Sequence, residues 1–376
     1  MKINRIVFIL AFLTLGNLSF LSAQFQKQYF QHRQLIEAKS NELYLAMRAS
    51  GFFNNNEFFD THVEGYTLIG NYFQPVLYYY FSPEFSVSGG AHLLKYHGQE
   101  GFADVMPWLS VHYHPMEKLR ISLGSFNKGA ILNLPEPLYM FENQFTDLQG
   151  NGIMIDYRGK RWNSVSWLDW ISFIEQGDPF REEFVFGHSG AFTLFGDETH
   201  SLKIPYYILA EHKGGQINIS DEPVETRMDF GGGLEWTKDY NHGIFNNILL
   251  KADIFYEKAS RDATDGMAVS GYGGLEGELF SFGLGYFNGQ NKESILGPPL
   301  LFSPEDISTM EDDRQQFILF KAGIGKRLGE NSSFTLRFEG YYDLGIQQMQ
   351  YSYGLFIMVD EWIRLFSPEH KTARVY

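Results

Sequence analysis

The chain has 376 residues, of which 17% are aromatic, 38 are glycine and none is cysteine, with 30 basic against 45 acidic side chains. Such an aromatic-rich composition excludes a disordered chain, and the net charge of −15 argues against nucleic acid, whose binding requires a basic surface. Without cysteine there is no disulfide scaffold, no cysteine-ligated zinc and no thiol nucleophile.

The first 23 residues are typical of a signal peptide. Lys2 and Arg5 precede a short apolar stretch at 6–15, and Leu21-Ser22-Ala23 is an acceptable cleavage site. After residue 23 no apolar run approaches the roughly 20 residues that a membrane-spanning helix needs. We therefore expect an exported protein with a short periplasmic segment at 24–41.

The rest of the chain alternates between apolar and polar residues. Leu250 and Ile254, for example, share one parity, whereas Lys251 and Asp253 share the other. Because successive side chains of a β-strand point to opposite faces, each such segment has one apolar and one charged face. Repeated charges in mid-strand and aromatic residues near strand ends favour a transmembrane barrel over a soluble sandwich.

We predict about sixteen strands, with fourteen to eighteen as the range. In chain order they span 42–51, 64–81, 85–97, 103–114, 119–130, 151–158, 162–174, 183–195, 200–212, 224–237, 243–258, 266–277, 279–289, 314–327, 333–345 and 349–366. Tight turns alternate with longer connections such as 52–63, 131–150 and 290–313. The predicted fold is an all-β, transmembrane, up-and-down antiparallel barrel with short periplasmic turns and long extracellular loops.

This pattern resembles bacterial outer-membrane porin-like β-barrels over nearly all of 40–366. The last strand ends in Trp362-Ile363-Arg364-Leu365-Phe366, which looks like the terminal signal that the barrel-assembly machinery reads, although a tail at 367–376 follows it. The resemblance implies a barrel domain at 42–366 in the outer membrane of a Gram-negative bacterium. It also implies that the 131–150 loop either folds into the pore or is an ordinary external loop.

A Lys or Arg that faces lipid at mid-depth costs about 2–4 kcal/mol, so the charged parity is expected to face the lumen. The predicted pore-lining residues are Arg120, Lys128, Lys203, Arg227, Asp229, Lys251, Asp253, Lys321, Arg337 and Glu339. Sixteen strands leave room for an aqueous channel. Paired charges would keep this channel open, whereas a dense network with an inserted loop would close it; we favour an open lumen.

Signals for catalysis and metal binding are weak. His112 and His114 share the inner face and are the only candidates for a metal site, but no third ligand is evident. His188 and Ser189 are adjacent in a strand, so they point to opposite faces and cannot act together. We therefore predict no catalytic residue, no cofactor and no enzyme activity.

The leading functional hypothesis is a passive channel for small hydrophilic solutes or ions. A non-conducting structural barrel within an envelope complex is the alternative, and a hydrolase acting on membrane lipid or on peptide is the third hypothesis. The expected partners are outer-membrane lipid, the barrel-assembly machinery, and either further copies of the chain or an envelope protein, with no nucleic acid.

Overall fold

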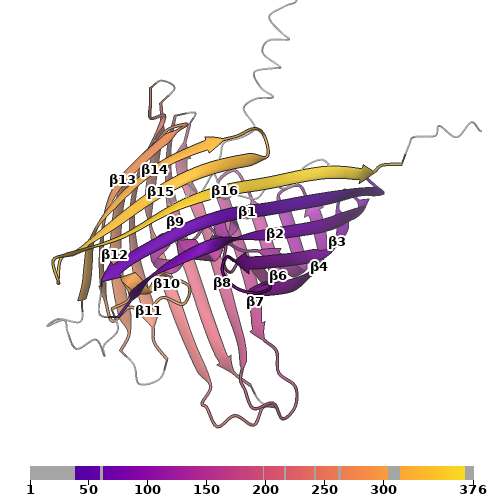
Figure 1. Cartoon of the computed structure of the whole chain (residues 1–376), viewed down its shortest axis with the longest axis horizontal. Helices are drawn as coiled ribbons and strands as arrows, with labels where there is room; N and C mark the ends of the chain where they lie inside the picture. Colours follow the sequence, from indigo (N-terminus) through magenta and orange to yellow (C-terminus); the bar gives the residue numbers. More distant parts are fainter. Residues whose placement is uncertain are drawn as a thin grey trace, which may run out of the picture.

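A computed structural model describes residues 39–59, 62–197, 199–215, 217–240, 243–260, 264–303 and 314–368. The expected signal peptide, nearly all of the 24–41 segment and most of the 367–376 tail lie outside these residues. Sixteen antiparallel strands close into a barrel, which confirms the predicted fold (Figure 1). No helix in the described part of the chain is long and apolar enough to cross a membrane.

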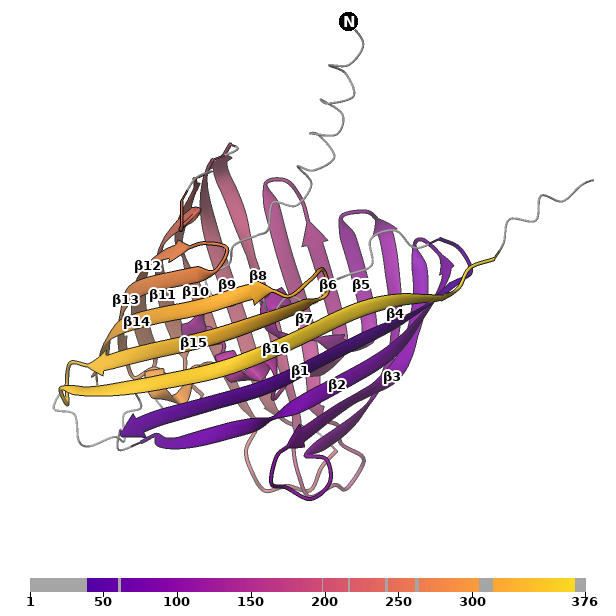
Figure 2. The same ribbon diagram turned by 45° about the horizontal axis from the view of Figure 1, so that its top comes forward.

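Each strand pairs with its neighbours in the chain, and β1 pairs with β16 to close the sheet. The strands are β1 (Glu42–Phe59), β2 (Glu64–Ser82), β3 (Phe85–Tyr96), β4 (Asp104–Met116), β5 (Leu119–Asn127), β6 (Gln149–Arg158), β7 (Trp162–Ser172), β8 (Glu182–Gly196), β9 (His200–Gly214), β10 (Glu225–Asp239), β11 (Asn247–Lys258), β12 (Gly266–Glu276), β13 (Phe280–Gln290), β14 (Arg314–Arg327), β15 (Ser332–Asp343) and β16 (Gln348–Phe366). In Figure 2, β1, β2 and β16 run as long, oblique strands across the front of the barrel.

The connections differ between the two ends of the barrel. One end has tight turns such as 83–84, 117–118 and 159–161, whereas the other carries 128–148 and 291–313. Both the start of β1 and the end of β16 lie at the tight-turn end, because the number of strands is even. We call the opposite end the long-connection end.

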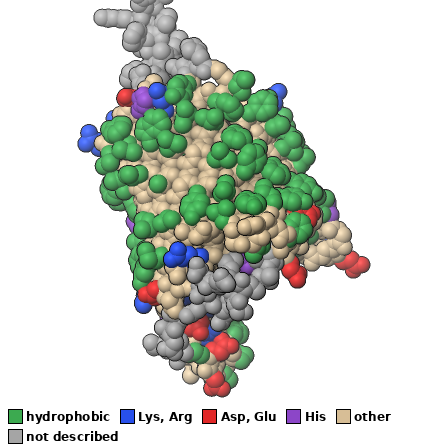
Figure 3. All heavy atoms as spheres, turned by 90° about the vertical axis from the view of Figure 1, so that its left-hand side faces the viewer, with side chains coloured by type: hydrophobic (Ala, Val, Ile, Leu, Met, Phe, Trp, Pro, Cys, Tyr) green, Lys and Arg blue, Asp and Glu red, His purple; other side chains and the backbone are tan. Residues whose placement is uncertain are grey.

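The wall has an apolar outer face and a polar inner face. On β11, Leu250 and Ile254 are about half exposed, whereas Lys251 and Asp253 are buried. Figure 3 shows the same separation over one side of the molecule, with hydrophobic side chains spread over the wall and charged ones gathered towards its ends. An apolar band between polar ends is the surface that a bilayer requires.

The first strand is longer than the sequence predicted. Residues 52–59 were expected in a loop, but β1 continues to Phe59 and pairs with both β16 and β2. Residues 54–56 are three consecutive asparagines inside this strand, although asparagine is depleted in strands. In the structure Asn54 and Asn56 point inwards to a buried carboxylate, whereas Asn55 points outwards and bonds to Thr67 and Glu57.

Gly187 on β8 allows the large indole of Trp167, on the neighbouring β7, to lie flat against the wall. A Cβ at Gly187 would overlap that ring, which is fully buried. We expect Gly187→Ala to lower the free energy of unfolding by about 1–3 kcal/mol, as overpacking does. Urea unfolding of the refolded barrel, followed by its electrophoretic band shift, measures this loss.

Gly51→Ala on β1 is the matched control, since no atom lies within 4 Å of a Cβ at Gly51. This variant should unfold at the urea concentration of the wild type or above it. Equal losses in the two variants would contradict the assigned packing.

Candidate functional site

Two connections from the long-connection end fold into the barrel. The first, residues 128–148, contains three short 3₁₀ turns, η2 (Gly129–Leu132), η3 (Glu136–Leu138) and η4 (Phe141–Gln144); we call it the inner segment. The second, residues 291–303, contains η5 (Pro299–Leu301); we call it the strap. Of the two possibilities left open for the 131–150 loop, the structure shows the inward one.

Apolar contacts hold both segments against the wall. Leu132, Leu134, Leu138 and Tyr139 of the inner segment and Leu300 and Leu301 of the strap are buried in one cluster with aromatic side chains of the wall. That cluster includes Trp167 on β7 and Phe317 on β14, which come from well-separated parts of the sheet. The interior is therefore occupied by folded chain.

The ten charged residues predicted to line the lumen lie on the inner face of the wall, or directly after it in the case of Lys128. Each has an oppositely charged partner. Some pairs join two strands, such as Arg120 with Asp156 at 3.3 Å. Others join the wall to an inserted segment, and Lys321 on β14 bridges Glu136 of the inner segment and Glu339 of β15.

A pocket of about 70 Å³ lies between the two inserted segments and the wall formed by β1, β2, β15 and β16. Part of its lining is apolar: Phe58, Val63, Phe141, Leu300 and Leu301. The rest is polar, with three carboxylates from Glu136, Glu142 and Glu339. An apolar pocket with a few convergent polar groups is the usual form of a small-molecule site.

Glu142 is the carboxylate of the three that is held by neutral donors. Its Oε1 accepts hydrogen bonds from the side-chain amides of Asn54 at 2.8 Å and Asn56 at 2.6 Å, and its Oε2 accepts one from the hydroxyl of Tyr66 at 2.6 Å. Glu142 is 7% exposed, whereas Tyr66 is 37% exposed. The carboxylate is thus held by the first two strands and lies one side chain away from the surface.

Burial raises the pKa of the Glu142 carboxyl, because desolvation penalises its charged form. The hydrogen bonds from Tyr66, Asn56 and Asn54 oppose this effect without cancelling it. A carboxylate with a raised pKa is a stronger base than an exposed one, and such groups concentrate at functional sites.

The two histidines considered for metal binding do not have the surroundings of a metal site. His112 lies on the inner face of β4, with one ring nitrogen 2.9 Å from the hydroxyl of Ser88 and the other 2.9 Å from that of Ser122. Both nitrogens therefore have protein partners. Over the described residues, no group of three or more His, Asp or Glu side chains could hold a metal ion around His112, His114 or elsewhere.

A histidine–serine pair lies on the outer wall. As expected, His188 and Ser189 point to opposite faces, and the Ser189 hydroxyl donates to the backbone oxygen of Leu132. His188, however, pairs with Ser166 on β7, with 2.7 Å between Nδ1 and Oγ. The ring of Tyr206 lies 5.3 Å from that of His188. No carboxylate completes this pair among the contacts of the described residues, and it lies midway along the wall.

Sequence reasoning missed Glu142, Asn54, Asn56 and Tyr66. The sequence of the inner segment mixes apolar and acidic residues, and that mixture was the available signal. It could not show which acid meets the wall, because the three donors lie 76 to 88 residues away along the chain.

The family model described as "Lipid A 3'-O-deacylase-type" matches residues 35–368. The chain belongs to this family. The match covers the whole barrel, both inserted segments and every residue of the pocket. The family is one of enzymes, so the expectation of no enzyme activity is wrong. No curated protein matches the sequence.

Solved structures show the same architecture with little sequence similarity. OprD of Pseudomonas aeruginosa is 9% identical with a TM-score of 0.51, over 88% of this chain and 98% of that one. An anion-selective porin from Comamonas acidovorans is 10% identical with a TM-score of 0.48, over 86% and 99%. At this identity the likeness to OprD shows the fold alone, a porin-like sixteen-stranded barrel.

Lys321 should contribute strongly to stability, because its ammonium neutralises the buried Glu339 and the partly buried Glu136. Lys321→Met would leave Glu136 with a hydrogen bond from Tyr341 but no countercharge. Breaking a buried ion pair from one side costs about 3–5 kcal/mol, and we expect a loss at the lower end because Glu339 keeps Arg337. Urea unfolding measures it.

Lys203→Met is the control for this prediction. Lys203 pairs with Glu235 at 3.4 Å, but Glu235 also has Lys251 at 3.9 Å. Its carboxylate therefore keeps a countercharge, and the loss should be clearly smaller. An equal or larger loss for Lys203→Met would refute the ranking.

Proposed function

We propose that this protein is an outer-membrane esterase that hydrolyses an ester-linked acyl chain of a lipid A-type glycolipid. The observation that carries the proposal is the buried Glu142 carboxylate at a partly apolar pocket, in a chain of the lipid A 3'-O-deacylase-type family. The third of the hypotheses formed from the sequence, a lipid hydrolase, is the one that these features support best.

The position of the pocket suits a lipid substrate. Val63 and Pro298 of its lining belong to connections at the long-connection end, which in an outer-membrane barrel faces the cell exterior. Tyr66 and Phe58 extend the lining towards the rim of the wall. An acyl ester from the outer leaflet could reach this rim without crossing the membrane, and the apolar side chains would accept methylene groups of the chain.

The chemistry we assign to Glu142 is general-base catalysis. Three of the lone-pair directions of its carboxylate are used by Asn54, Asn56 and Tyr66, which leaves one for a water molecule. Glu142 would accept a proton from that water as its oxygen attacks the ester carbonyl carbon. The carbon–oxygen bond to the sugar then breaks, and the proton passes to the departing sugar oxygen, giving a fatty acid and an alcohol.

A second function, the passage of small solutes, is supported by the porin-like wall and its ring of inward charges. The inserted segments oppose free passage because they occupy the interior.

Glu142→Gln should abolish hydrolysis while the barrel folds. A general base contributes about 100- to 10,000-fold, so the rate of fatty-acid release from purified lipopolysaccharide should fall at least about 100-fold. Mass spectrometry of the lipid product reads the loss, and the heat-modifiable electrophoretic band confirms folding.

Ser166→Ala is the discriminating control, because it removes the serine that pairs with the outward His188. It should leave the rate unchanged. The opposite pattern, a loss in Ser166→Ala with activity retained in Glu142→Gln, would move the site to the outer wall. If neither the wild type nor its variants released any acyl chain, the esterase proposal would fail.

The pH dependence of hydrolysis should follow Glu142. The base acts when deprotonated, so the rate should fall as the pH drops through a pKa that burial has raised above that of an exposed glutamate. The Tyr66 hydrogen bond lowers this pKa, so Tyr66→Phe should raise it further and move the acid limb of kcat/KM to higher pH. Tyr353→Phe, an exposed tyrosine on the outer face, should leave the profile in place.

A further inference from the structure

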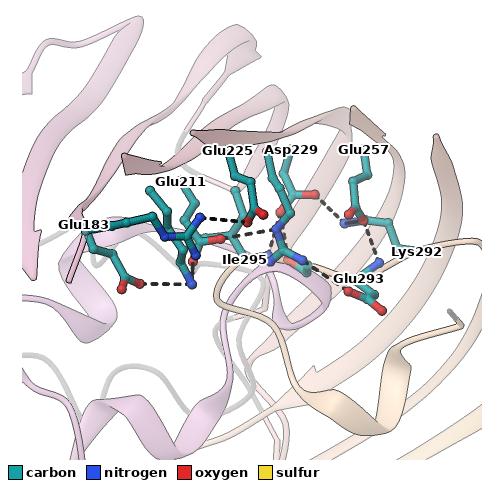
Figure 4. A network of polar contacts seen from close by, with 12 residues as sticks. Glu183, Glu211, Glu225, Asp229, Glu257, Lys292, Glu293 and Ile295 are labelled. Carbon is teal, nitrogen blue, oxygen red and sulfur yellow. Dashed lines mark hydrogen bonds and ion pairs between the residues drawn. The ribbon is translucent and has the colours of Figure 1, made fainter. Parts of the chain in front are cut away.

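The strap is fixed to the wall by a buried cation. Lys292 is 2% exposed, and its ammonium forms ion pairs with Asp229 of β10 and with Glu257 of β11, the latter at 3.3 Å. Asp229 is fully buried and Glu257 is 4% exposed. We call these three residues the anchor; Figure 4 shows Lys292 reaching the two carboxylates from the inserted chain.

Further hydrogen bonds from the strap converge on the same two carboxylates. The Ser294 hydroxyl and the Ile295 backbone N–H donate to Asp229 at 3.1 and 3.0 Å. The Glu293 backbone N–H donates to Glu257 at 2.6 Å. The strap therefore supplies all of these donors, and the wall supplies the two charges that need them.

The strap in turn supports the inner segment. The backbone N–H of Met140 donates to the backbone oxygen of Leu296 at 2.7 Å, and Leu300 and Leu301 pack in the same apolar cluster as Leu132. These contacts link the anchor to the chain that occupies the interior. Loss of the anchor would remove the buried cation that attaches the strap to β10 and β11, and would leave the Arg227–Glu293 ion pair at 3.2 Å as the remaining charged contact on that side.

Without Lys292, Asp229 and Glu257 would face each other as buried like charges. Buried carboxylates without a cation are unfavourable unless they are protonated or hydrated, and hydration of these two requires the strap to leave the lumen. A wall of sixteen strands surrounds enough space for an aqueous channel once the chain inside it is withdrawn.

We propose that the anchor of Asp229, Lys292 and Glu257 is a latch that keeps the lumen closed. With the strap in place the barrel does not conduct, and with the strap withdrawn small hydrophilic solutes and ions pass along the charged inner face of β9 to β13. The proposal does not depend on the esterase activity, because conductance is read without any lipid substrate being hydrolysed.

Single-channel conductance of the refolded full chain in a planar bilayer tests the latch. We expect no conductance from the wild type. Lys292→Glu places three carboxylates together, and we expect it to give conductance steps on the nanosiemens scale. The double variant Lys292→Glu/Asp229→Lys restores one cation among two carboxylates and should be silent again. Lys258→Glu makes the same change of net charge at an exposed pair with Asp265, and should also be silent.

Nanosiemens steps from the wild type would overturn the proposal, because the lumen would then be open with the latch formed. Silence from Lys292→Glu whose band is heat-modifiable would overturn it as well. Should Lys292→Glu fail to fold, a glycine–serine segment in place of 293–302 tests the same point, since it removes the strap and leaves the wall intact. Conductance of that variant supports the latch, and its silence refutes it.

Discussion

The structure depends on one constraint: a closed sheet in a bilayer can present charge only to its interior. Side chains point alternately outwards and inwards along each strand. The positions between the apolar, outward-facing residues therefore point into the barrel and can hold polar residues. The chain uses these positions for full charges, among them Lys251, Asp253, Lys321 and Glu339, and all four are buried. Buried charges require oppositely charged partners. The charged inner face of the wall therefore needs countercharges inside the barrel.

The inserted segments supply some of these countercharges. Glu136 neutralises Lys321, and Lys292 neutralises Asp229 and Glu257. In each case the ion pair joins the wall to a long connection. The interior of this barrel is thus held together by ion pairs around an apolar cluster. An open aqueous channel with the same number of strands would need neither.

Much of the wall could be predicted from the sequence, because alternation is a local property and sixteen strands follow from counting it. The polar residues that act across strands could not. Glu142 meets Asn54 and Asn56 only because the inner segment folds back to β1, and Ser166 meets His188 only because of the register between β7 and β8. The sequence correctly placed His188 and its chain neighbour Ser189 on opposite faces. The partner that His188 does have, Ser166, depends on the register between two strands, which the alternation does not determine. Enzyme activity was not predicted for the same reason, since no contiguous sequence motif was found that indicates it.

The arrangement of the inner segment explains how a site of this kind can exist in a barrel wall. On one side Glu136 is fixed by Lys321 and Tyr341, and on the other Glu142 is fixed by β1 and β2. The carboxylate that we assign as a base is therefore positioned by two rigid strands, and the segment that carries it is fastened at a second point six residues earlier. A base held in this way loses little freedom when a substrate arrives, and its burial keeps it basic. The filled interior is then part of the site, because an open lumen would leave Glu142 in water with an ordinary pKa and no fixed direction.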